Sequence, residues 1–354
     1  MKALKQETLR VAELDDKESE IHTVFLGGGT PSLIAPDQLR DLLTSIRAAF
    51  TVRTDAEISM EVNPGTVTRE KMVGYQQLGV NRVSLGVQSF RNEELNLLGR
   101  IHTVDGAYQA IESIRKAGIT NINLDLIYGL PGQTTDDWEV SLRSVLEIRP
   151  EHISLYCLTI EDGTPLASAV NDGEIEPIDE DIAAAMYEMA IEQLASSYEH
   201  YEISNWARYG DGVSDLKCRH NLQYWQNNEY IGLGVGAHGY FRGIRYENPK
   251  TIPEYLVKMS SPGQFNVEGS KVDDAEKARD EMLLGLRLLS KGVKRDEFRM
   301  KFGKDFQAVF AGKIDNLVRS GLVTWTDADH SALVLTKRGM MLGNQVFMEF
   351  SGED

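Results

Sequence analysis

Residues 22–33 read HTVFLGGGTPSL, and this stretch decides how the first part of the chain is interpreted. A short apolar run, residues 23–26, passes directly into Gly27, Gly28 and Gly29. Consecutive glycines tolerate positive φ angles and let a backbone approach a ligand closely. A tight turn uses the same residues, so this loop alone does not separate a binding loop from a structural turn.

Strand-like and helix-like segments alternate after this loop. Apolar runs predict the strands, and the segments between them carry apolar residues at helical spacing. The strands look apolar on both faces, which is typical of a parallel sheet covered by helices. Repeated βα units of this length favour a barrel or an open α/β sheet. The predicted strands are residues 22–27, 57–62, 82–88, 121–128 and 152–158.

The pattern changes after Trp206. The next segment is rich in glycine and loop-forming residues, and the last part predicts three helices, two short strands (LVTW and ALVLT) and a helix at residues 338–349. Three helices with a two-stranded wing are typical of a small winged-helix-like α/β module. We therefore expect three parts: residues 1–206, 207–271 and 272–354.

Composition excludes several classes of partner and site. The net charge of −17 over 354 residues argues against nucleic acid or an anionic membrane surface as the main partner, because both need a basic footprint. Long apolar runs and a signal-like N-terminus are missing, which favours a cytoplasmic protein. The two cysteines, Cys157 and Cys218, form no closely spaced pair, fit a reducing compartment, and are too few for a zinc or iron–sulfur site.

Polar side chains stand at or near the ends of the predicted strands, where α/β proteins place their sites. Glu61 ends one strand and can pair with an amine, whereas a capping or salt-bridged glutamate is the structural alternative. Gln88 ends the next strand and can bond hydroxyl groups, and Arg100 can clamp a carboxylate or simply lie on the surface. Asp125 lies inside an apolar strand and needs a partner, for which ribose hydroxyls are suitable. Together these side chains fit an amino acid joined to a nucleoside.

Four motifs in this order carry a family resemblance: GGGTP at 27–31, ExNP at 61–64, LGVQSF at 85–90 and DLIYGLPGQT at 125–134. The chain resembles the radical S-adenosylmethionine superfamily over essentially its whole length, and it is most similar to the oxygen-independent coproporphyrinogen III oxidase-like group. The segment CRHNLQYW, residues 218–225, contains an HNxxYW signature that resembles the heme chaperone (HemW-type) branch.

The resemblance implies a fold and a cofactor. The fold is an incomplete (β/α)6 partial barrel that lacks its first strand and is followed by the small C-terminal module. The glycine loop and Glu61 match positions that hold the amino group of S-adenosylmethionine, Arg100 matches the clamp on its carboxylate, and Gln88 and Asp125 match the contacts to its ribose. The expected cofactor-binding set is Gly28, Gly29, Thr30, Glu61, Gln88, Arg100 and Asp125.

The signature also implies a heme site. His220, Asn221, Tyr224 and Trp225 match the positions linked to heme, and imidazole is a suitable axial ligand for iron. His220 is therefore the heme-iron candidate, with a hydrogen-bonded loop histidine as the structural alternative. His238, in GVGAHGYF, is a second and weaker candidate.

The family pattern begins with a CxxxCxxC segment whose thiolates hold a 4Fe–4S cluster, and no cysteine precedes Cys157 here. An incomplete chain and a natural protein that has lost the cluster are the two interpretations, and the intact cofactor-binding motifs favour the first. A barrel without its first strand leaves an unpaired edge, so we expect poor solubility or a homodimer. We assign no catalytic residue and expect no radical chemistry from this chain alone.

Two functions from different classes follow from the resemblance. The first is a heme chaperone that binds heme or a related porphyrin and delivers it to an acceptor protein, for example a membrane-associated respiratory enzyme. The alternative is an anaerobic oxidase of porphyrin biosynthesis, and a non-functional remnant of either is the third interpretation. The HNxxYW signature favours the chaperone.

Overall fold

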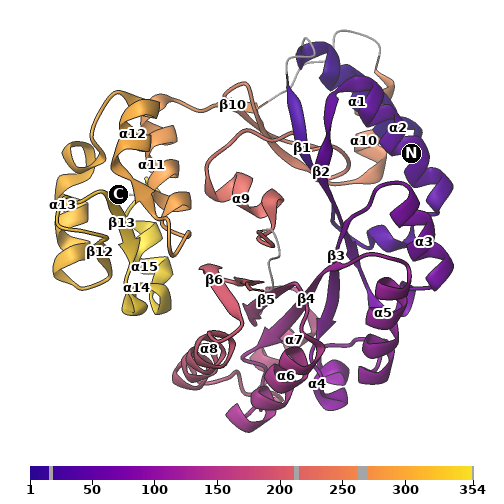
Figure 1. Ribbon diagram of the computed structural model, residues 1–354, viewed down its shortest axis with the longest axis horizontal. Coiled ribbons are helices and arrows are strands. Elements are labelled where there is room, and N and C mark those ends of the chain that lie inside the picture. Colours follow the sequence, from indigo (N-terminus) through magenta and orange to yellow (C-terminus); the bar gives the residue numbers. More distant parts are fainter. Residues whose placement is uncertain (16–18, 211–214, 262–268, 353–354) are drawn as a thin grey trace. The chain divides into compact units, whose positions relative to one another are not determined.

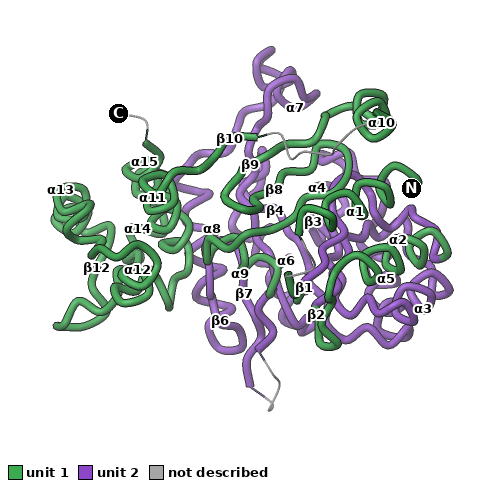
Figure 2. Tube along the Cα trace, turned by 90° about the horizontal axis from the view of Figure 1, so that it is seen from above, with its two compact units in different colours: residues 1–22, 37–56, 219–354 green, residues 23–36, 57–218 purple. Residues whose placement is uncertain are grey.

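The computed structural model describes residues 1–15, 19–210, 215–261 and 269–352. The chain divides into two compact units, drawn in different colours in Figure 2. Unit 1 comprises Met1–His22, Asp37–Ala56 and Arg219–Asp354, and unit 2 comprises Thr23–Pro36 and Glu57–Cys218. None of the described helices is long and apolar enough to cross a membrane.

A seven-stranded sheet of order β1-β2-β3-β4-β5-β7-β6 forms the framework of unit 2. Strands β2 to β5 pair in parallel, whereas β7 is antiparallel to both β5 and β6. The five predicted strands are confirmed as β1 to β5, and the sheet curls into a partial barrel of the expected α/β class (Figure 1). The strands are β1 Glu20–Leu26, β2 Thr51–Val62, β3 Arg82–Gln88, β4 Asn121–Tyr128, β5 His152–Cys157, β6 Tyr198–Glu202 and β7 Asn205–Arg208.

Helices cover the outer side of this sheet (Figure 1). Threonine hydroxyls cap several of them: Thr68, Thr103 and Thr134 each accept a hydrogen bond from the first turn of the following helix, which satisfies one of its unpaired backbone amides. The helices of unit 2 are α3 Arg69–Gln77, α4 Asn92–Leu97, α5 Val104–Lys116, α6 Thr135–Ile148, α7 Pro165–Asn171 and α8 Glu180–Leu194, with short 3-10 turns η1 Pro31–Leu33 and η2 Pro64–Thr66.

The two faces of the sheet differ in polarity, and here the expectation of strands apolar on both faces is wrong. Positions such as Val83, Leu85 and Leu124 are buried apolar residues. The alternate positions of the same strands are buried polar residues, among them Ser84 and Asn123. Successive side chains of a strand point to opposite faces, so the polar set shares one face. This alternation was not recognised in the sequence because the residues on both faces of the sheet are buried.

In unit 1, two helices, α1 and α10, pack around a buried carboxylate. Glu7 of α1 accepts hydrogen bonds from the backbone amide of Gly234 at 2.8 Å, from Nδ2 of Asn248 at 2.5 Å and from the hydroxyl of Tyr255 at 2.6 Å. Burial raises the pKa of Glu7, and these donors oppose that shift. The contacts fasten α10 and the glycine-rich loop before β8 to α1. The elements are α1 Lys2–Asp15, α2 Pro36–Ala49, α9 Arg219–Trp225, α10 Ile252–Ser260, β8 His238–Phe241, β9 Ile244–Glu247 and β10 Gly269–Lys271.

The C-terminal part of unit 1 packs around buried aromatic rings, including Phe298 and Phe306, whose centroids lie 5.6 Å apart. The three predicted helices and the two wing strands are confirmed, and β11 adds a third strand to the wing. The single helix expected at 338–349 is wrong, because Leu342 leaves the helical conformation and divides it in two. The elements are α11 Asp274–Gly285, β11 Val293–Lys294, α12 Arg295–Phe302, α13 Phe306–Arg319, β12 Val323–Trp325, β13 Ala332–Leu335, α14 Lys337–Met341 and α15 Gly343–Met348.

Candidate functional site

The polar face of the sheet brings the ends of β2, β3 and β4 together within unit 2. Glu61 is level with Ser84 in the β2–β3 pair, and Gly86 is level with Asp125 in the β3–β4 pair. Paired residues on neighbouring strands share a face and lie close together. Glu61 and Asp125 therefore belong to one surface.

The glycine loop after β1 closes on Glu61. The backbone amide of Gly28 donates to Oε2 of Glu61 at 3.0 Å. Gly28 and Gly29 have φ angles of 80° and 64°, which glycine adopts freely, and a Cβ on either would meet nothing within 4 Å. The hydroxyl of Thr30 lies 3.5 Å from Nδ2 of Asn63, at the limit of a hydrogen bond. The loop thus presents open backbone beside a carboxylate.

Gln88 has an unusual backbone that turns its side chain over the polar face. Its φ angle is 70°, and the β3–β4 register shifts between Gly86 and Gln88. A Cβ on Gly86 would lie 2.8 Å from Nε2 of Gln88 and 3.3 Å from Oδ1 of Asn63. Glycine at position 86 therefore leaves the space that these two amides occupy.

Arg100 lies on a loop that is fastened to the same strand ends. Nε2 of His102 contacts the carbonyl oxygen of Val87 at 3.1 Å, and Ile101 lies 3.5 Å from the Cβ position of Gly65 in the turn η2 that follows β2. The Nε atom of Arg100 is buried and has no hydrogen-bond partner among the described residues. A buried donor without a partner is costly, so this nitrogen favours an acceptor supplied by a ligand.

Asp125 already has protein partners. The hydroxyl of Ser84 donates to Oδ2 at 2.9 Å, and Nδ2 of Asn123 donates to Oδ1 at 2.7 Å. Burial raises the pKa of Asp125 to about 6, opposed by these two donors and by the charge of Arg82. The carboxyl is therefore held in a defined orientation and remains able to accept from a hydroxyl group.

A hydrogen-bonded chain behind Asp125 escaped the sequence analysis. The Tyr201 hydroxyl lies 2.8 Å from Nε2 of His152, whose Nδ1 lies 2.6 Å from Oδ1 of Asn123. Because Oδ1 accepts, Nδ1 carries the proton and Nε2 accepts from Tyr201. Burial holds the pKa of His152 well below its ordinary value, so this ring is neutral. Polar residues at every second strand position were the sequence signal that could have revealed it.

The loop after β4 has its own support, which was also missed. Oε1 of Gln133 accepts from the backbone amides of Gly129 and Leu130 at 2.8 and 3.2 Å. Nε2 of the same side chain donates to Oε1 of Glu94 at 3.1 Å. Gln133 therefore holds the YGLPGQ turn against α4, and the motif is a structural clamp as well as a family marker.

The predicted heme residues lie in unit 1, on the short helix α9. His220 and Tyr224 are one helical turn apart, and Nε2 of His220 lies 2.9 Å from the Tyr224 hydroxyl. The ring of Tyr224 meets that of Tyr230 edge to face at 4.6 Å. The guanidinium of Arg287 lies 4.4 Å from the ring centre of Trp225, and Asn221 is half-buried on the same helix. The structure thus brings His220, Tyr224 and Trp225 onto one helix and adds Tyr230 to the row.

Neither cysteine lies in a group suited to a metal cluster. Cys157 is exposed and Cys218 is buried, with its Sγ 3.6 Å from Oε1 of Glu57. Across the described ranges, no group of three or more His, Cys, Asp or Glu side chains is arranged to hold a metal ion.

Sequence comparisons place this chain among known proteins. The Radical SAM superfamily model matches residues 3–145, and the HemN C-terminal domain model matches residues 272–342. The chain is 36% identical to the heme chaperone HemW of Lactococcus lactis, over 95% of this chain and 86% of that protein. It is 43% identical to the heme chaperone HemW of Escherichia coli, over 89% of this chain and 82% of that protein.

A comparison with solved structures agrees on the fold. The coproporphyrinogen III oxidase HemN from Escherichia coli, described as a radical SAM enzyme, superposes with a TM-score of 0.81. The match covers 99% of this chain and 82% of that chain at 23% sequence identity. At that identity the likeness shows a common fold.

Proposed function

Because this chain belongs to the heme chaperone HemW family of the radical SAM superfamily, we propose that it binds heme and delivers it to an acceptor protein. The observation that carries the proposal is the pair of His220 and Tyr224 on α9, within the HNxxYW signature. An imidazole fixed by a hydrogen bond through one ring nitrogen is the usual arrangement of a metal-bound histidine. We assign the heme iron to His220, with Asn221, Tyr224 and Trp225 around it.

S-adenosylmethionine is the second ligand in the proposal. The unpartnered Nε of Arg100 fits its carboxylate, and Glu61 beside the open backbone of Gly28 and Gly29 fits its ammonium group. Gln88 and Asp125, which share the polar face of the sheet, are suited to hydrogen bonds with the hydroxyl groups of its ribose. When bound in a radical SAM protein, this cofactor supplies an organic radical on reduction. The residues of this chain only bind and orient it.

The 4Fe–4S cluster of the superfamily does not fit the residues present. Cluster ligation needs converging thiolates, and the sequence has only Cys157 and Cys218, of which one is exposed and the other buried. No step of the proposed function passes through a cluster. The oxidase alternative rests on the HemN C-terminal domain match and on a solved structure at 23% identity, whereas the relatives at 36% and 43% identity are heme chaperones, so the chaperone is the function we propose.

Finer points belong to the same proposal. We divide the chain into a partial barrel at 1–206, a connecting region at 207–271 and a C-terminal module at 272–354, and the two family models fall within the first and third parts. Two free cysteines fit a reducing cytoplasm. Transfer of heme to a membrane-bound apo-enzyme tests a membrane-associated acceptor, and light scattering tests a homodimer.

Heme titration of the full chain tests the proposal. The wild-type chain is expected to bind heme with a shifted Soret band, and His220→Ala is expected to weaken binding and change the band. His330→Ala, which removes a histidine that stacks on Trp325 in the C-terminal part, is the control and is expected to bind heme like the wild type. A wild-type chain that leaves the heme spectrum unchanged would refute the function, and an unaffected His220→Ala variant would remove His220 from it.

A further inference from the structure

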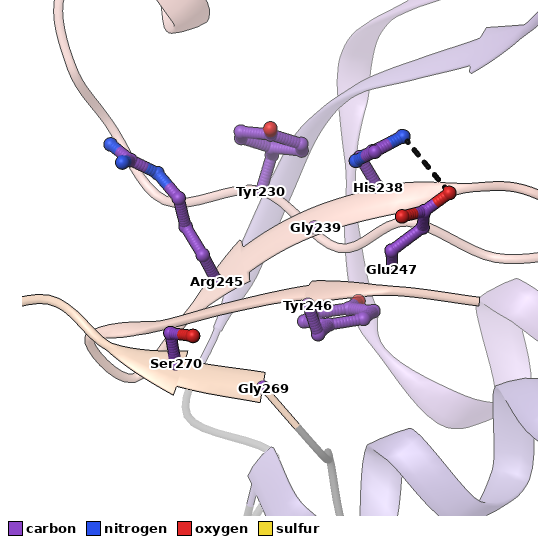
Figure 3. A pocket seen from close by; sticks show the side chains of 8 residues that line it. All are labelled: Tyr230, His238, Gly239, Arg245, Tyr246, Glu247, Gly269 and Ser270. Carbon is purple, nitrogen blue, oxygen red and sulfur yellow. Dashed lines mark ion pairs between the residues drawn. The ribbon is translucent and has the colours of Figure 1, made fainter. Parts of the chain in front are cut away.

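A pocket in unit 1 lies on the sheet formed by β8, β9 and β10, and the proposed function leaves it unused (Figure 3). In the β8–β9 register, His238 is opposite Glu247 and Tyr240 is opposite Arg245. Opposed residues of antiparallel strands share a face. Tyr230 joins this face because it forms a β-bridge with Tyr240. The pocket lining is Tyr230, His238, Gly239, Arg245, Tyr246, Glu247, Gly269 and Ser270.

The pocket floor is backbone rather than side chain. Gly239 and Gly269 are level with Tyr246 on either side of it. A Cβ on Gly239 would lie within 2.4 Å of three atoms of the Tyr246 side chain, so only glycine fits there. Tyr246 in turn fastens the preceding loop, since its hydroxyl accepts from the amide of Gly232 at 2.9 Å and donates to the carbonyl of the same residue at 3.1 Å. Tyr246 therefore ties the strand backbone of this part of the pocket to the preceding loop.

His238 is arranged as an accessible metal ligand. Its side chain is 67% exposed, and its Nε2 lies 3.7 Å from Oε1 of Glu247 (Figure 3). Within the part of the chain that the structure describes, its Nδ1 has no hydrogen-bond partner. A carboxylate beside one ring nitrogen orients many metal-bound histidines and leaves the other nitrogen for the metal.

Tyr230 connects the pocket to the proposed heme helix. Tyr230 lines the pocket, and its ring meets that of Tyr224 edge to face at 4.6 Å. The ring of Tyr224 meets that of His220 in the same way at 5.1 Å. An unbroken row of three rings therefore joins α9 to the face that carries His238.

The chemistry of the lining selects among ligands. Arg245 is the cation among the lining residues. Its guanidinium pairs with Glu276 at 2.8 Å and with Asp280, and these carboxylates offset the positive charge that would attract a small anion. A bare divalent ion needs more ligands than His238 and Glu247 supply. An iron porphyrin needs an imidazole for its iron and an aromatic contact for its ring, and His238 and Tyr230 supply them here.

We propose that this pocket binds heme, with His238 as an iron ligand and Tyr230 as a contact to the porphyrin ring. This inference rests on the proposed function and extends it to a second histidine outside the HNxxYW signature. Binding forms a coordinate bond from His238 to iron and displaces water or another weak ligand, without any redox change.

Titrations of the full chain with heme and with metal-free protoporphyrin IX test the proposal. His238→Ala is expected to lower heme affinity at least about tenfold, since losing only an orienting partner of a metal ligand costs that much. It is expected to change the Soret band and the electron paramagnetic resonance of ferric heme, and to leave protoporphyrin IX affinity unchanged. Tyr230→Leu is expected to lower the affinity for both ligands about threefold or more. His330→Ala is the matched control, and circular dichroism verifies folding.

Each other outcome is decisive. His238→Ala titrations that match the wild type with both ligands would overturn the inference, while a loss in His220→Ala would leave the proposed function standing. An equal loss of heme and protoporphyrin IX affinity in His238→Ala would show that the residue shapes the pocket and does not bind iron. A wild-type chain that binds no heme would overturn the inference and the proposed function together.

Discussion

The amide of Gly28 donates to the carboxylate of Glu61 over 3.0 Å, and this bond joins the loop after β1 to the end of β2. Burial raises the pKa of the Glu61 carboxyl, and the hydrogen bond from Gly28 opposes that shift. The ionised carboxylate is therefore poorly compensated by the protein alone. A ligand ammonium group would supply the missing charge, which is why Glu61 is the first residue to test.

Glu61→Gln is expected to lower the affinity for S-adenosylmethionine about tenfold or more, because it removes a charge-assisted hydrogen bond worth at least ~1.4 kcal/mol. Isothermal titration calorimetry measures this. In the wild type, affinity is expected to fall as the pH drops through the raised pKa of Glu61, since a proton then competes with the ammonium group. Glu70→Gln, at an exposed position, removes the same charge and is expected to have no effect. Equal affinities of wild type and Glu61→Gln would rule out this contact.

Arg100→Lys is expected to weaken S-adenosylmethionine binding about tenfold, although the charge is retained. Lysine lacks the planar fork that binds a carboxylate through two parallel hydrogen bonds, and it leaves the Nε position of Arg100 empty. S-adenosylmethionine titrations of the variant and of exposed Arg69→Lys provide the comparison. If Arg100→Lys binds as tightly as the wild type, charge alone holds the ligand and the bidentate contact is absent.

The ends of β2, β3 and β4 were predictable because each strand is followed by a turn signal. Glu61 precedes an Asn-Pro-Gly turn, and Asp125 is the carboxylate within the predicted strand at residues 121–128. The position of Arg100 relative to them was not predictable by spacing. It depends on the contact of His102 with the carbonyl of Val87, and such a contact leaves no sequence pattern.

Other features were missed for identifiable physical reasons. β6 and β7 are short, and β6 reads YEHYE, so neither produces an apolar run. The polar face was missed because its serines and asparagines are buried by bonding to one another, as Ser84 and Asn123 do at 2.7 Å. Small polar residues can be buried when they form hydrogen bonds with one another, and a pattern of apolar residues does not reveal them.

Asp125→Asn is expected to change the pH dependence of stability. Folding raises the pKa of Asp125 from 3.8 to about 6, so the fold favours the protonated carboxyl. Its contribution is complete below about pH 4 and is lost as the pH rises through 6, a loss of at most ~3 kcal/mol. Asparagine does not titrate, so the free energy of unfolding of the variant relative to the wild type is expected to increase over this window. Urea titrations at pH 4, 5, 6 and 7 measure it.

The control for this prediction is Asp172→Asn, which removes an exposed carboxylate after α7. Its stability relative to the wild type is expected to stay constant from pH 4 to 7. A constant difference for Asp125→Asn as well would show that the hydrogen bonds from Ser84 and Asn123 fully offset the burial of the carboxyl.

Tyr224→Phe tests which nitrogen of His220 is available to iron. The Tyr224 hydroxyl holds Nε2 of His220 at 2.9 Å, so the iron ligand is expected to be Nδ1, with Tyr224 as the orienting partner. Removing the hydroxyl frees the imidazole to rotate, and heme affinity is expected to fall about tenfold. Tyr108→Phe removes an exposed hydroxyl elsewhere and is expected to leave heme binding unchanged. Heme titration followed at the Soret band distinguishes the two nitrogens, because tighter binding by Tyr224→Phe would mean that the hydroxyl competes with iron for Nε2.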